Sequence, residues 1–229
     1  MKKLFAVVCA AGISLTALSA SAAEDKTVIA NRIEAARQVL TEIEATPDKA
    51  IPNKIMQQAK CVGVFPSVKK GAFLLGAEYG QGVVSCRTPQ GWSAPAFIRI
   101  AGGSFGFQLG AQSIDLVLVA VNDRGFQDLL KNKFKLGGDA SAAAGPIGRD
   151  SQAATDWKMS AELLTYSRAK GLFAGIDLNG AVVDQNIDAT RTFYGTAYPF
   201  EQLLKGEVAV PTEARPFVRT VAKYFVSVQ

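Results

Sequence analysis

The sequence contains no histidine, and this absence removes several kinds of chemistry at once. Serine or cysteine nucleophiles that depend on a histidine base are excluded, and so are metal sites with imidazole ligands. The commonest general base of enzymes is missing as well. The composition therefore favours a binding protein over an enzyme, and no metal or other cofactor is predicted.

Long apolar runs are also scarce. Lys2 and Lys3 precede a mostly apolar run over 4–18, and the small residues 20–22 follow it. This is the layout of a secretory signal peptide, and the run is shorter than the roughly 20 apolar residues of a membrane span. We expect cleavage after Ala22 (signal peptide 1–22) and a periplasmic or secreted protein that associates with a membrane peripherally at most.

Cysteine is rare, and only Cys61 and Cys86 lie beyond the expected leader. Each falls in a predicted strand, with a predicted hairpin between them. In an oxidising compartment such a pair is expected to form a disulfide, and two buried thiols are the alternative. A bridge that closes about 25 residues would stabilise the fold by roughly 3 kcal/mol.

Acidic residues are scarce in one part of the chain. Between residues 49 and 114 the only acid is Glu78, whereas seven residues are basic: Lys49, Lys54, Lys60, Lys69, Lys70, Arg87 and Arg99. Such asymmetry favours an anionic partner surface, although a solvated basic face gives the same pattern. The modest net charge of +5 and the export signal argue against nucleic acid.

The pattern of apolar residues predicts helices at the two ends and strands between them. The predicted helices cover 24–45, 52–59, 122–131 and 212–226. The predicted strands cover 61–65, 72–79, 81–87, 92–100, 104–111, 114–121, 161–166 and 172–183, with turns near 80, 102–103 and 112–113. The segment 137–146 is expected to be extended and closely packed.

This order of elements favours an α+β fold with an antiparallel sheet. Glycine is frequent in the strand regions, where it marks bulges, bends and close backbone approach. A curved, barrel-like sheet uses all three, so we expect a single domain over 23–229 with such a sheet, flanked by N- and C-terminal helices.

Three patterns resemble known catalytic or binding sites, but we assign a structural role to the residues of each. Ser167 and Lys170 match Ser-x-x-Lys, but the tripeptides that accompany this motif in enzymes are missing. The glycine-rich stretch 102–106 lacks the Gly-Lys-Ser/Thr ending of a phosphate loop. The spacing of three aspartates fits no EF-hand, and caps or turns explain them better: Asp115, Asp123 and Asp139.

Taken together, the segments resemble the SYLF lipid-binding domain family over residues 51–227. The motifs that carry the resemblance are Ile51-Pro52, Ala59-Lys60, Val64-Phe65-Pro66, Tyr79-Gly80-Gln81-Gly82, Trp92-Ser93-Ala94-Pro95, Gly103 to Gly110, Leu136-Gly137, Gly145 to Arg149 and Tyr166 to Gly175.

The resemblance implies a binding module with affinity for anionic lipid head groups. In a bacterial envelope these are the head groups of anionic phospholipids such as phosphatidylglycerol or cardiolipin. Relatives that bind lipid use an amphipathic helix before the domain, but the helix over 24–45 is net acidic, so we expect it to pack on the sheet. Two alternatives stay open: a periplasmic protein that binds a protein partner, and a carrier of a lipid in an internal cavity.

The candidate lipid contacts are basic side chains from three parts of the sequence. The first group is Lys54, Lys60, Lys69, Lys70 and Arg87. The second is Lys131, Lys133 and Lys135, which share one face if the segment is extended. Arg149, Arg168 and Lys170 lie in family motifs, where a contact with lipid and a structural role are equally expected.

Overall fold

The computed structural model describes residues 24–45, 51–73, 75–105, 110–145, 161–169, 172–173 and 178–226. Its helices are α1 (Lys26–Glu44), α2 (Asn53–Gln58), α3 (Asp123–Leu130), α5 (Ile187–Tyr194), α6 (Phe200–Leu204) and α7 (Arg215–Tyr224), with a 3-10 turn η2 (Thr212–Ala214) before α7. Its strands are β1 (Cys61–Phe73), β2 (Leu75–Thr88), β3 (Gly91–Trp92), β4 (Ala96–Phe105), β5 (Gly110–Ala120), β6 (Lys133–Lys135), β7 (Ala142–Ala144), β8 (Leu163–Ala169), β9 (Leu172–Phe173) and β10 (Val182–Gln185).

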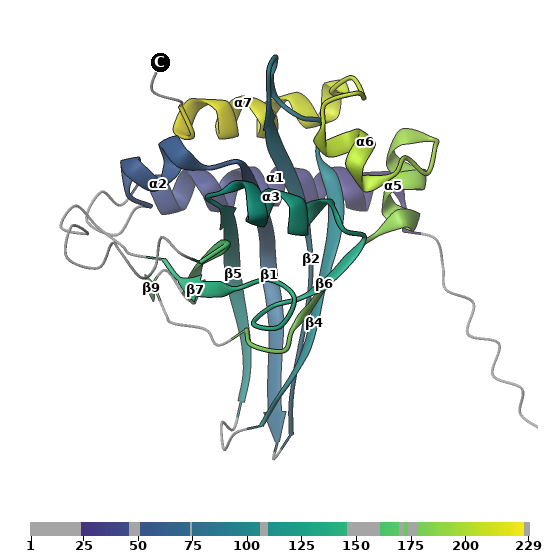
Figure 1. Cartoon of the computed structure of the whole chain (residues 1–229). Helices are drawn as coiled ribbons and strands as arrows, with labels where there is room; N and C mark the ends of the chain where they lie inside the picture. Colours follow the sequence, from purple (N-terminus) through teal and green to yellow (C-terminus); the bar gives the residue numbers. More distant parts are fainter. Residues whose placement is uncertain are drawn as a thin grey trace, which may run out of the picture.

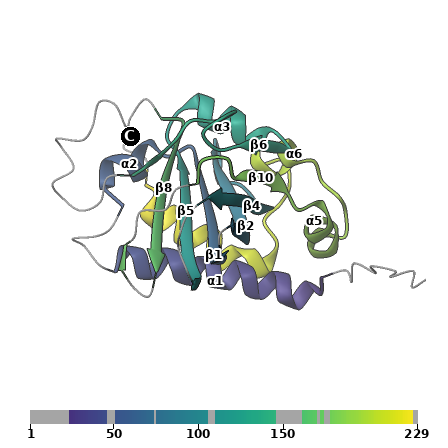
Figure 2. The ribbon, with the colours of Figure 1, turned by 90° about the horizontal axis from the view of Figure 1, so that it is seen from below.

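The strands form one strongly curled sheet in the order β6-β10-β4-β2-β1-β5-β8-β7, with β3 paired to β2 and β9 to β8. Every pairing is antiparallel except that of β7 with β8. The view along the strands in Figure 2 shows the curl as a half-barrel. The predicted α+β fold with a barrel-like sheet between terminal helices is thus confirmed (Figure 1).

A bulge in β1 helps to bend the sheet. The pairing of β1 with both of its neighbours shifts around Pro66 and Ser67, and Ser67 takes a positive φ of 57°. A bulge adds a residue to one strand and increases its local twist. The predicted end of this strand at Pro66 is therefore wrong, because the proline lies in a bulge and the strand continues to Phe73.

Glycines in the long strands mark close packing rather than turns. A Cβ added at Gly80 would lie 2.8 Å from a methyl group of Val68, and one at Gly102 would lie 3.1 Å from Ala181. The predicted turns near 80, 102–103 and 112–113 are wrong, since β2, β4 and β5 run through them. β1 and β2 instead reverse between Phe73 and Leu75.

Two apolar layers cover the two faces of the sheet. One face packs against α1, α2, α5 and α7, around side chains such as Val64, Val83 and Phe97. The inside of the curl is filled by side chains of the strands, such as Leu118 of β5 and Phe134 of β6, and by apolar side chains of α3 and α6. Among the described residues, the curl is thus packed with side chains.

Helix α1 lies where its sequence pattern predicts, with its apolar side buried against the sheet and α7. Its first turn is capped by Asp25, whose carboxylate accepts from the Thr27 amide at 2.7 Å. The expectation that this helix packs on the sheet is confirmed. None of the described helices is both long and apolar enough to cross a membrane.

Two helices, α5 and α6, were not predicted, and the predicted strand over 172–183 is divided into β9 and β10. The segment 137–146 contains a turn and the short parallel strand β7, so its extended character is confirmed in part. Residues 106–109 fall outside the described chain, so the predicted strand over 104–111 is only partly described, and its two ends belong to β4 and β5.

Candidate functional site

The cysteines predicted to pair do so. Cys61 of β1 and Cys86 of β2 lie directly opposite each other, with their Cα atoms 4.0 Å apart, and form a disulfide. Both side chains are fully buried inside the curl. The bridge therefore locks the start of β1 to the end of β2 within the packed interior.

Among the predicted lipid contacts, Arg87 is held within the fold. Its Nε donates to the carbonyl of Ala59 at 3.1 Å, and Nη2 donates to the carbonyl of Phe225 at 2.9 Å. The guanidinium also lies 4.8 Å from the centre of the Trp92 ring. Burial lowers the pKa of Arg87 from its ordinary value. These contacts fasten the ends of α2 and α7 to the sheet.

Arg168 is likewise engaged by partners of its own chain. Its guanidinium pairs with Glu42 of α1 and with Asp115 of β5, the latter at 3.0 Å. The Arg168 side chain is only 14% exposed. Asp115 also accepts from the Ser67 amide at the bulge, so this network joins α1, β5, β8 and the bend in β1.

Three more candidates form ion pairs with acids. Lys60 lies 3.2 Å from Asp123 and Lys131 lies 2.5 Å from Asp128. Lys70, with a side chain 16% exposed, lies 3.9 Å from the buried Glu78. Arg149 and Lys170 fall outside the described residues.

Four candidates remain exposed and form no ion pair with the other described residues: Lys54, Lys69, Lys133 and Lys135. Lys133 and Lys135 flank the buried Phe134 and so share one face of β6, whereas Lys131 follows α3. Lys69 donates to Ser113 at 3.3 Å. The four belong to α2, β1 and β6, which lie apart, so the fold does not gather them into one cluster (Figure 1).

Helix α7 carries basic residues that sequence reasoning missed. Arg215, Arg219 and Lys223 recur at every fourth position and are exposed. The opposite side of the helix buries Phe217 and Val221. The signal was present in the sequence, since the predicted helix over 212–226 implies that residues four apart share a face.

Acids, by contrast, are almost all engaged within the described chain. Ion pairs take up Glu24, Glu34, Glu42, Glu78, Asp115, Asp123, Asp128, Asp184, Asp188, Glu201 and Glu213. Backbone N–H groups bind Asp25, Asp139 and Glu162. The backbone hydrogen bonds leave the charge of these carboxylates in place, and the exposed acids outside the ion pairs are Asp25, Asp139 and Glu207. Among the described residues, exposed cations without a carboxylate partner outnumber these acids.

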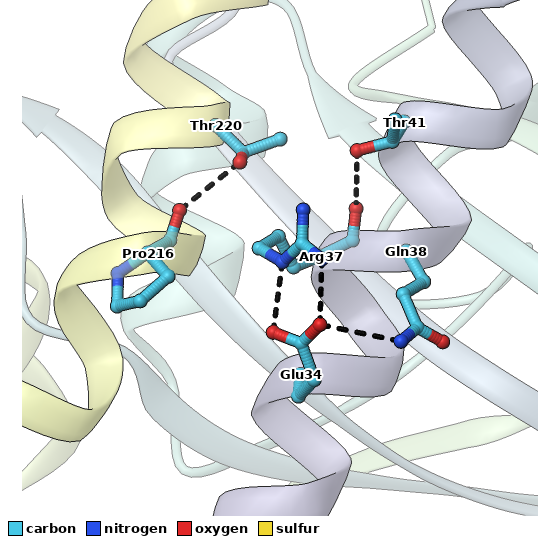
Figure 3. A network of polar contacts seen from close by, with 6 residues as sticks. All are labelled: Glu34, Arg37, Gln38, Thr41, Pro216 and Thr220. Atoms are coloured by element: carbon cyan, nitrogen blue, oxygen red, sulfur yellow. Dashed lines mark hydrogen bonds and ion pairs between the residues drawn. The ribbon is translucent and has the colours of Figure 1, made fainter.

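The pair of Glu34 and Arg37 on α1 illustrates this neutralisation. Arg37 donates to both Glu34 oxygens at 2.8 and 2.6 Å, and Gln38 adds a bond of 3.2 Å (Figure 3). The hydrogen bond from Arg37 lowers the pKa of Glu34 and raises that of Arg37. The surface of α1 beside α7 is thus locally balanced in charge.

Among the carboxyl groups of the described residues, only Glu44, at the end of α1, has a strongly raised pKa. Burial raises its pKa to about 7, although a hydrogen bond from the Ile51 amide opposes the shift. Burial also raises the pKa of Tyr166, with a smaller contribution from Glu44. No group of three or more metal-binding side chains occurs in the part of the chain that the structure describes.

The fold and this charge pattern are those of a helix-flanked half-barrel domain with a mainly basic free surface. Residues 101–224 match the profile of a family described as "Ysc84: Las17-binding protein actin regulator". The chain is also 37% identical over 170 residues to the SH3 domain-containing YSC84-like protein 1 of Bos taurus, covering 73% of this chain and 50% of that protein. The human protein of that name is 36% identical over 170 residues, covering 73% of this chain and 49% of its own.

Protein YSC84 of Saccharomyces cerevisiae is 33% identical over 176 residues, covering 75% of this chain and 37% of the yeast protein. The chain belongs to the Ysc84 family, whose domain is the SYLF domain that its motifs resemble. It spans about half the length of the animal relatives that it matches.

Proposed function

We propose that this protein binds anionic phospholipid at a membrane surface of the cell envelope and catalyses no reaction. The observation that carries the proposal is the imbalance of free charge among the described residues. Only three exposed acids lie outside the ion pairs, Asp25, Asp139 and Glu207, whereas the exposed cations without an acidic partner are Lys54, Lys69, Arg124, Lys133, Lys135, Arg215, Arg219 and Lys223. Each basic side chain near an anionic membrane adds on the order of 1 kcal/mol of attraction.

The test is co-sedimentation of the purified protein with vesicles of neutral phosphatidylcholine, and with vesicles that also contain phosphatidylglycerol. We expect binding to the anionic vesicles only, and loss of that binding at high salt, because salt screens exposed charges. Failure to bind anionic vesicles at low salt would remove the membrane from the function. Equal binding to both vesicle types would show that head-group charge is not recognised.

We further propose that residues 1–22 direct export and that residues 23–229 form a single periplasmic or secreted domain. The disulfide between Cys61 and Cys86 supports export, because such bonds persist in oxidising compartments. N-terminal sequencing of the protein from a periplasmic fraction tests the cleavage site after Ala22. Recovery of the uncleaved chain from the cytoplasm would refute it.

A protein partner is the second candidate, because the matching family is described as Las17-binding. The partner of this chain would be a protein of the compartment in which this chain itself is found. Crosslinking in cells followed by mass spectrometry separates the two candidates, since a partner-binding protein is recovered with one dominant neighbour.

A further inference from the structure

The outward face of α7 carries a straight basic row of Arg215, Arg219 and Lys223, here called the α7 row. Because the three residues are separated by four positions, their side chains lie on one side of the helix, over about 12 Å of its length. All three are exposed. The row is therefore an array of positive charge that points away from the protein.

The other side of α7 is fixed to the body of the protein. Phe217, Val221 and Phe225 are fully buried against the layer that includes α1. Arg87 binds the carbonyl of Phe225 at 2.9 Å and so holds the end of the helix. Figure 1 shows α7 lying across the end of the molecule opposite the tips of the long strands. The row is thus presented on a rigid support.

Two acids beside α7 are bound by other cations. Glu213, just before α7, lies 3.1 Å from Lys26. A backbone hydrogen bond of Glu213 is the main cause that lowers the pKa of its carboxyl group, and the contact with Lys26 lowers it further. Glu34, on the neighbouring side of α1, is bound by Arg37 (Figure 3). Lys223 lies 5.1 Å from the centre of the Tyr224 ring, a contact that leaves its charge in place.

We infer that α7 is the element by which the protein lies on an anionic bilayer, with the α7 row against the lipid head groups. The inference rests on the proposed function and names its surface. A linear set of cations on a fixed helix matches a flat, multivalent anionic surface in charge and shape. Val226, which is 57% exposed just beyond the helix, adds an apolar contact at that end.

The mode of docking follows from the packing. An interfacial helix normally buries its apolar face among lipids, but in α7 this face is occupied by the protein. Docking through the α7 row is therefore electrostatic, and high salt will release it.

The test compares the unaltered protein with the variant R215Q/R219Q/K223Q on phosphatidylglycerol-containing vesicles at low salt. We expect the partition coefficient of the variant to fall by on the order of tenfold to a hundredfold, since three cations leave the contact. Thermal unfolding should be nearly unchanged, because all three side chains are exposed and unpaired. Unaltered vesicle binding by the variant would overturn the inference.

A matched control is K54Q/K133Q/K135Q, which removes the same amount of charge from exposed, unpaired positions on α2 and β6. We expect a loss of less than about threefold, since these positions contribute only to long-range attraction. Equal losses in the two triple variants would show dependence on net charge alone and overturn the inference. Failure of the unaltered protein to bind would overturn the proposed function as well, so the two failures are distinguishable.

An acidic protein is the competing occupant of the α7 row. If R215Q/R219Q/K223Q bound vesicles normally but lost a protein neighbour in crosslinking, the row would belong to that protein and the inference would fail.

Discussion

Replacement of Arg87 by methionine separates a structural role from a role in lipid binding. The arginine joins three distant parts of the chain, because it donates to the carbonyls of Ala59 and Phe225 and lies over the Trp92 ring. Methionine keeps the aliphatic stem but removes both donors and the charge. The substitution leaves two carbonyl groups without their partner at the ends of α2 and α7.

The expected cost follows from these contacts. A hydrogen bond to a charged group contributes about 1.5 kcal/mol or more, and the cation–π contact adds about 0.5–1 kcal/mol. Release of the half-buried guanidinium from its desolvated position offsets part of this sum. We expect Arg87→Met to lower the free energy of unfolding by about 3 kcal/mol, which corresponds to roughly 6–12 °C in Tm for a domain of this size.

The assay is urea unfolding followed by circular dichroism, together with co-sedimentation at a temperature where the variant is folded. Arg87→Lys is the matched control, because it keeps the charge but cannot bind both carbonyls in the same geometry. We expect it to lose about half as much stability. An unfolding free energy of Arg87→Met within about 0.5 kcal/mol of the parent would refute the structural role. A large loss of vesicle binding by a stable variant would return Arg87 to the lipid-binding surface.

Three further predictions concern stability. Replacing Cys61 and Cys86 by alanine should lower the unfolding free energy by about 3 kcal/mol or more, because the bridge closes a long loop; equal stability of the parent with and without a reductant in denaturant would contradict this. Gly82→Ala should cost about 2–3 kcal/mol, because the new Cβ would lie 2.3 Å from the Val64 carbonyl oxygen. Burial raises the pKa of Glu44 from 4.5 to about 7. Its contribution to stability is therefore complete below pH 4.5 and is lost as the pH rises through 7, by about 1–2 kcal/mol after allowance for partial exposure. In urea unfolding between pH 5 and 8, Glu44→Gln should flatten this slope. A parent that gains stability relative to the variant over that range would disprove the assignment.

The elements predicted well from sequence are those with local signals at their ends. Helix α3 begins after Asn122, whose side chain accepts from the Gly125 amide at 2.9 Å, and α1 begins after Asp25 in the same way. Caps and periodicity depend only on neighbours in sequence, so they can be recognised there. Short helices give weaker periodicity, and α5 was missed although Asn186 caps it and Gly195 ends it with φ of +75°.

Strand lengths were predicted less well, because glycine has two meanings that the sequence does not distinguish. It permits a turn, and it permits another chain segment to approach closely. Gly80 and Gly102 serve the second purpose, since Val68 and Ala181 occupy the space where a side chain would be. That distinction depends on residues far away in sequence.

The candidate site shows the same division. The sequence by itself determined the absence of histidine chemistry, the helical and strand periods, the pair of cysteines in facing strands and the supply of basic residues, because each depends on residue type and local spacing. Only the tertiary structure decided which cations remain free. Arg168 meets Asp115 53 positions away, and Arg87 reaches a carbonyl 138 positions away, so both are used within the fold. The α7 row stays free because packing buries the opposite face of its helix and neighbouring acids bind other cations. Neutralisation of a charge acts over a few ångströms in space, and only the folded chain determines those distances.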